Sequence, residues 1–344
     1  MGRSIDGGCD GGWDGGWKVW RGFGLALVVG LGCSSSGGSR PPAYLPVSST
    51  NQDSLYTIEM GDLKMVIDAA AGARVTEFSL FGTNVLTGTD VNDSNYGSTY
   101  WPSPQSSWCT VGGGCWPPPP ALDSQPYIGS VDAPTNVVQM TSGEAMLWAF
   151  AGSAVTVTKQ FTPVPEIGAI DVTYILSNTS TTVAVSVAPW QVSRVQGTGG
   201  LTFFGQGDGA PSYAPGNDSK FAVTEADGDV WYDFAPVNYN SKMLADGAGW
   251  IAHVTKSRLM YLLEYPDLPS TDAAPGEAEV EIFTGTDGDY VELENQGPLT
   301  DLAPGDAVVW TARWKLRQIP SGTSVAVGSS TLTSFAHAQL VDAE

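Results

Sequence analysis

Two acidic residues near the C-terminal end of the chain have a spacing that could support chemistry. Glu292 and Glu294 stand two residues apart in the strand-forming run Tyr290-Val291-Glu292-Leu293-Glu294. Alternate side chains of a strand point to the same face, so both carboxylates are expected on one side of a sheet. Two carboxylates placed in this way repel each other, and a fold usually keeps such a pair where water, a cation or a polar ligand receives it.

Two further groups are candidates to complete an acid–base site. His253 lies on a predicted strand over 249–254. It is either a structural histidine bonded to a neighbouring strand or a proton-transferring acid near Glu294. Glu264 is the second candidate, because a pair of carboxylates is the arrangement that glycosidases use. The sequence does not set the separation of these groups, so both interpretations stay open. His337, in the C-terminal tail, is expected to be structural.

Aromatic residues crowd the segment 96–127. Their ring faces can stack on the C–H faces of a pyranose, and their polar edges can form hydrogen bonds. Gln105 stands among them and is a candidate to bond a sugar hydroxyl. The alternative interpretation is that the rings cover the sheet as a hydrophobic lid. The aromatic residues of the segment include Tyr96, Tyr100, Trp101, Trp108, Trp116 and Tyr127.

The composition narrows the class of protein. The chain has 42 Gly and 23 Pro and is only 15% charged, which favours strands and turns over helices. The chain has a formal net charge of −21 and shows no basic patch, so nucleic acid is not an expected partner. We expect a neutral ligand such as a sugar. Phosphate-binding, dinucleotide-binding and zinc-protease motifs are not found, so we expect no cofactor and no metal site.

The first 33 residues predict an export segment. Lys18 and Arg21 precede an apolar run over 22–32, which suits a signal-peptide core better than a membrane span. Cys33 follows, and then a run of Ser and Gly, as at the cleavage site and tether of bacterial lipoproteins. We expect a lipid on Cys33 that anchors the protein in the cell envelope, at the outer membrane, and no other membrane contact. A periplasmic location is the other possibility. Simple secretion is the alternative.

Cysteine usage agrees with export. Cys109 and Cys115 are the two cysteines that follow the export segment, and Gly112, Gly113 and Gly114 lie between them. Three glycines let the loop curl tightly enough to bring the sulfur atoms together. In an oxidising compartment this predicts a disulfide.

The chain after the export segment reads as one β domain. We expect a linker over 34–55, a domain over 56–318 and a C-terminal strand and tail over 319–344. Many short alternating apolar runs with turn residues between them predict an all-β fold of antiparallel sheets, and a monomer. The pair 56–60 and 63–67 flanks Gly61-Asp62, a hairpin signal. The other predicted strands are 74–80, 81–86, 145–150, 154–161, 169–176, 183–190, 229–234, 249–254, 258–264, 278–284, 288–294, 307–316 and 323–327.

Several short motifs resemble the galactose mutarotase-like β-supersandwich over about 56–318. Leu293-Glu294-Asn295-Gln296 followed by Pro298 resembles the C-terminal catalytic strand of galactose mutarotases, and the hairpin over 74–86 resembles the first hairpin of the fold. An uncharacterised bacterial branch is the most similar in detail, because it shares the motifs Trp101-Pro102-Ser103-Pro104-Gln105, Trp116-Pro117-Pro118 and Ala188-Pro189-Trp190.

The resemblance implies roles for individual residues. Glu294 matches the general base of the mutarotases. The family's main His falls in the region that here reads 187–194, where Trp190 and Gln191 stand instead. Neither side chain transfers a proton at neutral pH, so ligand binding is expected and catalysis stays open. The residues expected to line the sugar site are Trp101, Gln105, Trp108, Trp116, Trp190, Gln191, Arg194 and Glu264.

The sequence therefore predicts an exported protein that binds a neutral carbohydrate in a cleft beside Glu294. The first alternative is an aldose 1-epimerase with Glu294 as base and His253 as acid. The second is a non-catalytic surface or structural lipoprotein that keeps only the fold.

Overall fold

The computed structural model describes residues 45–109, 114–214, 223–236, 240–286 and 288–340. The predicted export segment 1–33, with Cys33, lies outside the described residues, as does the first part of the predicted linker. No helix in the part of the chain that is described is long and apolar enough to cross a membrane.

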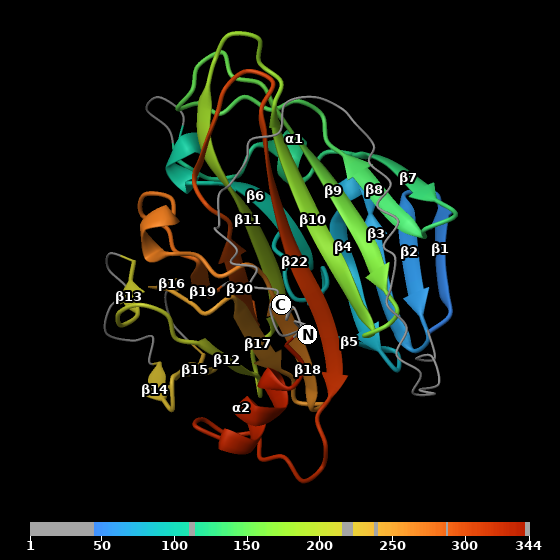
Figure 1. The fold of residues 1–344 in the computed structure, drawn as a ribbon, viewed down its shortest axis with the longest axis vertical. Helices are drawn as coiled ribbons and strands as arrows, with labels where there is room; N and C mark the ends of the chain where they lie inside the picture. Colours follow the sequence, from blue (N-terminus) through green and yellow to red (C-terminus); the bar gives the residue numbers. More distant parts are fainter. Residues whose placement is uncertain (1–44, 110–113, 215–222, 237–239, 287, 341–344) are drawn as a thin grey trace, which may run out of the picture. The chain divides into compact units, whose positions relative to one another are not determined.

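Two antiparallel sheets build the described domain (Figure 1). Sheet 1 has twelve strands and places β11 and β20 near its middle, with β6 on one side and β19 and β16 on the other. Its strands are β1 (Val47–Gln52), β2 (Leu55–Met60), β3 (Leu63–Asp68), β4 (Arg74–Leu80), β5 (Thr83–Asn84), β6 (Ser98–Ser103), β11 (Val185–Gln196), β13 (Ser212–Tyr213), β16 (Ser241–Ala245), β19 (Val280–Thr284), β20 (Tyr290–Gln296) and β21 (Thr300–Leu302).

Sheet 2 has ten strands, and the long strands β9, β10 and β22 form its regular part. Its strands are β7 (Ile128–Asp132), β8 (Val137–Thr141), β9 (Val155–Val164), β10 (Ala169–Asn178), β12 (Leu201–Gly205), β14 (Thr224–Ala226), β15 (Asp229–Asp233), β17 (Trp250–Val254), β18 (Leu259–Glu264) and β22 (Ala307–Gln318). The short helices are η1 (Ala69–Ala71), η2 (Gln105–Trp108), α1 (Pro120–Asp123), η3 (Ser270–Asp272) and α2 (Ser330–His337).

The core follows from the alternation of side chains along these strands. On β10, Ile170, Val172 and Tyr174 are buried, whereas the residues between them are partly exposed. The apolar faces of both sheets join in one cluster of buried residues. On β20, Val291 and Leu293 belong to this cluster. Glu292 and Glu294 alternate with Val291 and Leu293 and therefore point to the opposite side of sheet 1, which we call its outer face.

The predicted hairpin at Gly61-Asp62 is confirmed. Met60 and Leu63 form the last pair of β2 and β3, and Gly61 has a φ of 60°, a backbone conformation that glycine adopts without steric cost. The prediction for 145–150 is wrong. Ala145 forms one isolated bridge with Val155, and a turn follows at 148–152.

The two ends of the domain differ from the prediction. Strand β1 lies within the expected linker 34–55, where it pairs with β2 at the edge of sheet 1. Its residues are mostly polar and exposed, so they show no alternation of apolar and polar side chains. The sequence therefore did not indicate this edge strand. The expected strand over 323–327 is not formed. Instead α2 begins after Ser329, whose hydroxyl accepts a hydrogen bond from the Leu332 amide.

Helix α2 covers the outer side of sheet 2. Leu332 and Ala336 are fully buried in a second hydrophobic cluster together with Trp250 and Val254 of β17. The predicted domain boundary at 318 therefore does not separate the tail from the fold, and the described residues between 45 and 340 belong to one compact unit.

Candidate functional site

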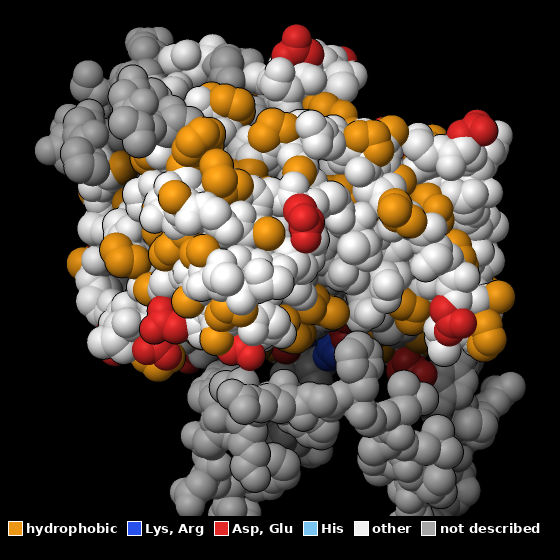
Figure 2. All heavy atoms as spheres, turned by 90° about the horizontal axis from the view of Figure 1, so that it is seen from above, with side chains coloured by type: hydrophobic (Ala, Val, Ile, Leu, Met, Phe, Trp, Pro, Cys, Tyr) orange, Lys and Arg blue, Asp and Glu red, His pale blue; other side chains and the backbone are white. Residues whose placement is uncertain are grey.

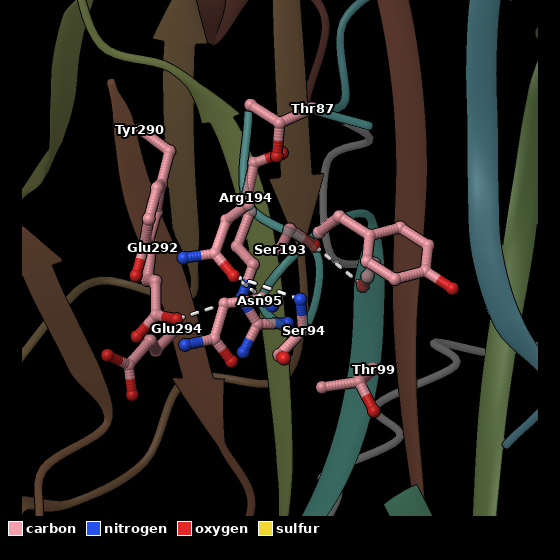
Figure 3. A network of polar contacts seen from close by, with 12 residues as sticks. Thr87, Ser94, Asn95, Thr99, Ser193, Arg194, Tyr290, Glu292 and Glu294 are labelled. Atoms are coloured by element: carbon pink, nitrogen blue, oxygen red, sulfur yellow. Dashed lines mark hydrogen bonds and ion pairs between the residues drawn. The ribbon is translucent and has the colours of Figure 1, made fainter. Parts of the chain in front are cut away.

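Glu292 and Glu294 lie on the same side of β20, and Arg194 of β11 lies beside them (Figure 3). The register of the sheet sets their neighbours, since Glu294 stands opposite Val192 on one side and Glu281 on the other. The centre of the outer face thus carries three glutamates, all buried.

Glu294 has two polar partners. Trp190 Nε1 donates a hydrogen bond to Glu294 Oε2 over 2.8 Å, and Lys242 Nζ lies 3.2 Å from the same oxygen. The ammonium of Lys242 also pairs with Glu281. Burial raises the pKa of Glu294 to about 7; the charge of Lys242 opposes this shift, and Glu281 adds to it.

Glu281 shares the same environment from β19. Burial raises its pKa to about 7 as well, again against the charge of Lys242. Gln296 Nε2 donates to Glu281 Oε1 over 2.9 Å, so the carboxyl group is also held by β20. With pKa values near 7, this pair carries less than two full negative charges at neutral pH.

Lys242 is the cation that joins the two carboxyl groups. Burial alone would lower its pKa, but Glu281 and Glu294 outweigh this effect and raise the pKa above its ordinary value. Its Nζ atom lies 4.5 Å from the centre of the Trp190 ring, within the range of a cation–π contact. Lys242 is therefore a fixed positive charge and not a proton donor at neutral pH.

Glu292 forms a separate pair with Arg194. The Arg194 Nε atom donates to Glu292 Oε1 over 2.8 Å, and the guanidinium lies 5.1 Å from the ring centre of Trp101. Burial raises the pKa of Glu292 to about 7, although Arg194 opposes this. Arg194 is completely buried, and its two Nη atoms find no hydrogen-bond partner among the described residues.

A cavity of about 570 Å³ opens beside Lys242, and we call it the acidic cavity. Strands β13, β16 and the segment before β19 form its walls, with Gln105 of η2 at one side. Its lining residues are Gln105, Asp208, Ala210, Ser212, Tyr213, Ala214, Lys242, Leu244, Ala245, Asp246, Ser270, Ala273, Gly276, Glu277, Ala278 and Glu279.

Carboxylates dominate the polar lining of the acidic cavity. Glu277 Oε1 accepts a hydrogen bond from the backbone amide of Gln105 over 2.8 Å. Glu279 accepts hydrogen bonds from the backbone amides of Gly247 and Gly249. Burial raises the pKa of Glu279 to about 7, although the hydrogen bond from Gly247 opposes it. Asp246 Oδ1 is buried without a hydrogen-bond partner among the described residues.

A second cavity, of about 460 Å³, lies among aromatic and proline residues, and we call it the aromatic cavity. Figure 2 views the end of the molecule where α1 lies in Figure 1, and shows many hydrophobic side chains at the surface there, with Lys and Arg scarce. The lining residues of the aromatic cavity are Trp108, Gly114, Trp116, Pro117, Pro118, Pro119, Pro120, Ala121, Gln125, Glu144, Ala145, Met146 and Trp148.

The predicted aromatic residues separate into two groups. Trp101, Trp108 and Trp190 are buried and contact one another, with ring centres 5.2–5.8 Å apart. Trp101 Nε1 donates to Asp123 over 2.8 Å. Trp116 is half-exposed and touches this cluster through Trp101. Trp101 and Trp190 thus pack as a support, and Trp116 presents a surface that a ligand can reach.

The predicted disulfide between Cys109 and Cys115 is present. It closes the loop that leads from η2 to Trp116. Gln105 Nε2 donates to the Cys115 carbonyl over 3.3 Å, which ties the loop back to the start of η2.

His253 does not lie with Glu294, so the predicted acid–base pair is not formed. His253 is on β17 of sheet 2 and alternates with Ala252 and Val254, which face α2. Its side chain therefore points into the core between the sheets, where Thr202 Oγ1 is 2.9 Å from Nδ1. Burial lowers the pKa of His253 to about 4, which fits a neutral, structural histidine.

Glu264 and Gln191 are also placed away from the outer face of sheet 1. Glu264 ends β18 on sheet 2 and pairs with Lys315 over 2.7 Å. Gln191 points into the core, where its Oε1 accepts hydrogen bonds from Trp314 and Tyr174. Neighbouring residues of a strand point to opposite faces, so Trp190 and Gln191 cannot both line one site.

Sequence reasoning missed Lys242 and Glu281. It also missed Asp208 and Asp246 of the acidic cavity and Trp148 of the aromatic cavity. A signal for Glu281 was present, because Glu279 and Glu281 repeat the two-residue spacing of Glu292 and Glu294 on the neighbouring strand. Lys242 gave no such signal, since only the order of the strands brings it to Glu294. Among the described residues, no group of three or more His, Cys, Asp and Glu side chains is arranged to hold a metal ion.

No protein-family model matches the chain, and no curated protein matches it. Several solved structures are similar to it in fold. A galactose mutarotase-like protein from Lactobacillus casei has 12% identity and a TM-score of 0.52, and the match covers 76% of this chain and 100% of that one. A galactose mutarotase related enzyme from Lactobacillus acidophilus has 10% identity and the same TM-score of 0.52, with 79% and 100% covered.

The Slr1438 protein from Synechocystis sp. has 12% identity and a TM-score of 0.52, and the match covers 83% of this chain and 100% of that one. Similarity at this level of identity establishes the architecture and leaves the chemistry of the site open. The fold predicted from the sequence is confirmed, and the chain folds as an antiparallel, galactose mutarotase-like β-sandwich.

Proposed function

We propose that the protein binds a neutral carbohydrate in the acidic cavity and does not catalyse its conversion. The observation that carries the proposal is the mixture of hydrogen-bonding groups around a cavity of about 570 Å³. Sugar hydroxyls both donate and accept hydrogen bonds, and binding sites for small polar ligands place a few such groups on a concave surface. Asp208 and Asp246 offer acceptors, and Gln105 and Lys242 offer donors.

The charge of the cavity supports a ligand without negative charge. Lys242 lines the cavity, but its ammonium is already paired with Glu281 and Glu294. The carboxylates of the lining are therefore not balanced, and they would repel an anion. The buried Asp246 Oδ1 has no hydrogen-bond donor among the described residues, and a sugar hydroxyl would supply one.

The environment of Glu294 favours binding without catalysis. The side chain is 1% exposed, is paired with Lys242 and lies on the other side of sheet 1 from His253. One observation keeps aldose 1-epimerase activity as a second candidate. The pKa of Glu294, raised to about 7, is suited to a general base at neutral pH. That activity would need a sugar ring to reach the buried carboxyl group of Glu294, whose Oε1 atom has no hydrogen-bond partner among the described residues.

Export and lipid attachment belong to the same proposal. We expect residues 1–32 to be removed and Cys33 to carry the lipid that holds a monomeric protein in the cell envelope. The test is mass spectrometry of the protein extracted from membranes. A lipid-modified Cys33 at the new N-terminus is expected, and an unmodified N-terminus elsewhere would contradict it.

Calorimetric titration tests the proposed binding with aldose monosaccharides and uncharged oligosaccharides as probes. Asp246→Asn and Gln105→Ala should each weaken binding by roughly tenfold, because the first replaces one carboxylate acceptor with an N–H donor and the second removes a donor. Each lost hydrogen bond is worth about 1–1.5 kcal/mol. Glu59→Gln, an exposed carboxylate on β2, is the matched control and should leave binding unchanged. Equal affinity in all variants would exclude the acidic cavity.

Polarimetry on the same sugars separates the two candidates. A binding protein leaves the rate of mutarotation unchanged. Acceleration by the wild-type protein that disappears in Glu294→Gln would replace our proposal with the epimerase. Absence of both binding and acceleration would support a protein that keeps the fold alone.

A further inference from the structure

We propose that the aromatic cavity is a second binding site, which takes the apolar face of an uncharged sugar ring between Trp116 and Trp148. This site does not depend on the acidic cavity, because the two cavities share no lining residue. They adjoin opposite ends of η2, where Gln105 lines the acidic cavity and Trp108 lines the aromatic cavity.

The first argument is the exposure of the two indole rings. Trp116 is 51% exposed and Trp148 is 50% exposed, and both line the same cavity. Large apolar side chains gathered at one exposed place mark binding sites more often than chance. An indole face fits the C–H face of a pyranose, and the stacked ring leaves its hydroxyls at the edge for hydrogen bonds.

The second argument is that the Trp116 ring and the backbone on both sides of Trp148 are held in place before a ligand arrives. Trp116 packs edge-on against Trp101 at 5.4 Å, directly after the Cys109–Cys115 disulfide. Trp148 lies between Leu147, which is completely buried, and Ala149, whose amide donates to the Ser107 carbonyl over 3.1 Å. Rings that are already ordered lose little conformational entropy on binding.

The third argument is charge. The lining contains Glu144 and no Lys or Arg, in a chain of net charge −21. An anionic ligand such as a uronic acid chain would find no partner there and would be repelled. Thr179 Oγ1 donates to Glu144 Oε1 over 2.9 Å, which orients the carboxylate at the cavity. Glu144 and the amide of Gln125 are suited to bond hydroxyls at the rim of a neutral ring.

The test uses the full chain and four probes in calorimetric titrations: maltohexaose, cellohexaose, hexagalacturonate and a proline decapeptide. We expect a neutral hexasaccharide to bind and hexagalacturonate to bind much more weakly. Trp148→Ala should reduce the affinity roughly fivefold or more, because one aromatic stacking contact is lost. Trp148→Phe keeps a ring and should restore most of the affinity.

Two further variants make the result specific. Phe81→Ala removes an exposed aromatic ring outside the cavity and should change nothing. Asp246→Asn, in the acidic cavity, should leave the contribution of Trp148 intact. Unchanged affinity for both hexasaccharides in Trp148→Ala, or binding of the proline peptide with no sugar bound, would overturn the proposal. Loss of binding in Asp246→Asn alone would leave the acidic cavity as the sugar site and exclude the aromatic one.

Discussion

The acidic cavity and the aromatic cavity lie at the two ends of one short helix, yet they are built on opposite physical principles. The acidic cavity sits beside a sheet face where Lys242 holds two buried carboxyl groups. The aromatic cavity is formed by rings and prolines on loops outside the sheets. The acidic cavity therefore depends on coupled charges that change with pH. The aromatic cavity depends on the packing of its rings and on the Cys109–Cys115 disulfide.

The difference suggests that the two cavities respond to different changes. Removing one charge beside the acidic cavity leaves other buried charges without compensation. Removing one ring from the aromatic cavity leaves a surface that water fills. The following predictions test this contrast, and they are arranged from the largest expected effect to the smallest.

Lys242→Met should destabilise the protein most. It leaves Glu281 and Glu294 opposite each other without a cation, and breaking a buried pair by removing one partner costs about 3–5 kcal/mol. Urea unfolding at pH 8 measures the loss. The matched control is Lys64→Met, which removes an ion pair with Glu77 at the surface and should cost about 1 kcal/mol or less. Equal effects of the two variants would contradict the contrast.

The double variant Cys109→Ser with Cys115→Ser should have an intermediate effect. The loop closed by the disulfide is short, with a sequence separation of 6. The loss of its loop-closure entropy corresponds to about 2 kcal/mol. Urea unfolding of the variant and of the reduced wild-type protein should agree, because both lose the same constraint. A wild-type midpoint that reduction leaves unchanged would contradict the prediction.

Taken per net proton and per pH unit, the pH dependence of stability should be the smallest effect. Glu279, Glu281, Glu292 and Glu294 have folded-state pKa values raised to about 7, so the folded state binds more protons than the unfolded state above about pH 4.3. The free energy of unfolding should therefore fall as pH rises from about 5 to 7, with a slope of about 1.4 kcal/mol per pH unit for each net proton.

His253 opposes this trend, because its lowered pKa makes the folded state bind fewer protons below about pH 6.5. Lys159 opposes it as well near pH 7, because burial lowers its pKa to about 7. The two residues contribute at most two protons against four, so the glutamates should decide the sign. Urea unfolding at pH 5, 6 and 7 measures the slope, and Glu281→Gln should reduce it. A free energy of unfolding that rises over this range would show that these glutamates are ionised in the folded state.

The sheet that carries the site was largely predictable. Strand β20 follows from the alternation of Val291 and Leu293 with Glu292 and Glu294, and the same rule could have shown that Trp190 and Gln191 point apart. The contact between Lys242 and Glu294 was not predictable, because it depends on β16 and β20 flanking β19 in the sheet.

Strand β6 shows why part of the fold could not be predicted. Pro102 stands in the interior of the sheet, where proline is normally disfavoured because it lacks an N–H donor. It lies opposite Pro189 of β11, so the loss falls on one pair of residues. The carbonyl of Pro102 accepts from Trp108 Nε1, and that of Pro189 accepts from the Gly297 amide. Such compensation exists only in the folded sheet.

Trp101 joins the two halves of this comparison. Its ring contacts Trp116, which lines the aromatic cavity, and Trp190, which donates to Glu294. These indoles touch one another, so a ligand in either cavity would act on the same group of emitting rings. A ligand in either cavity would alter the same emission band, so an emission change alone would not identify the occupied cavity, and assigning it would require replacing Trp116 and Trp190 in separate proteins.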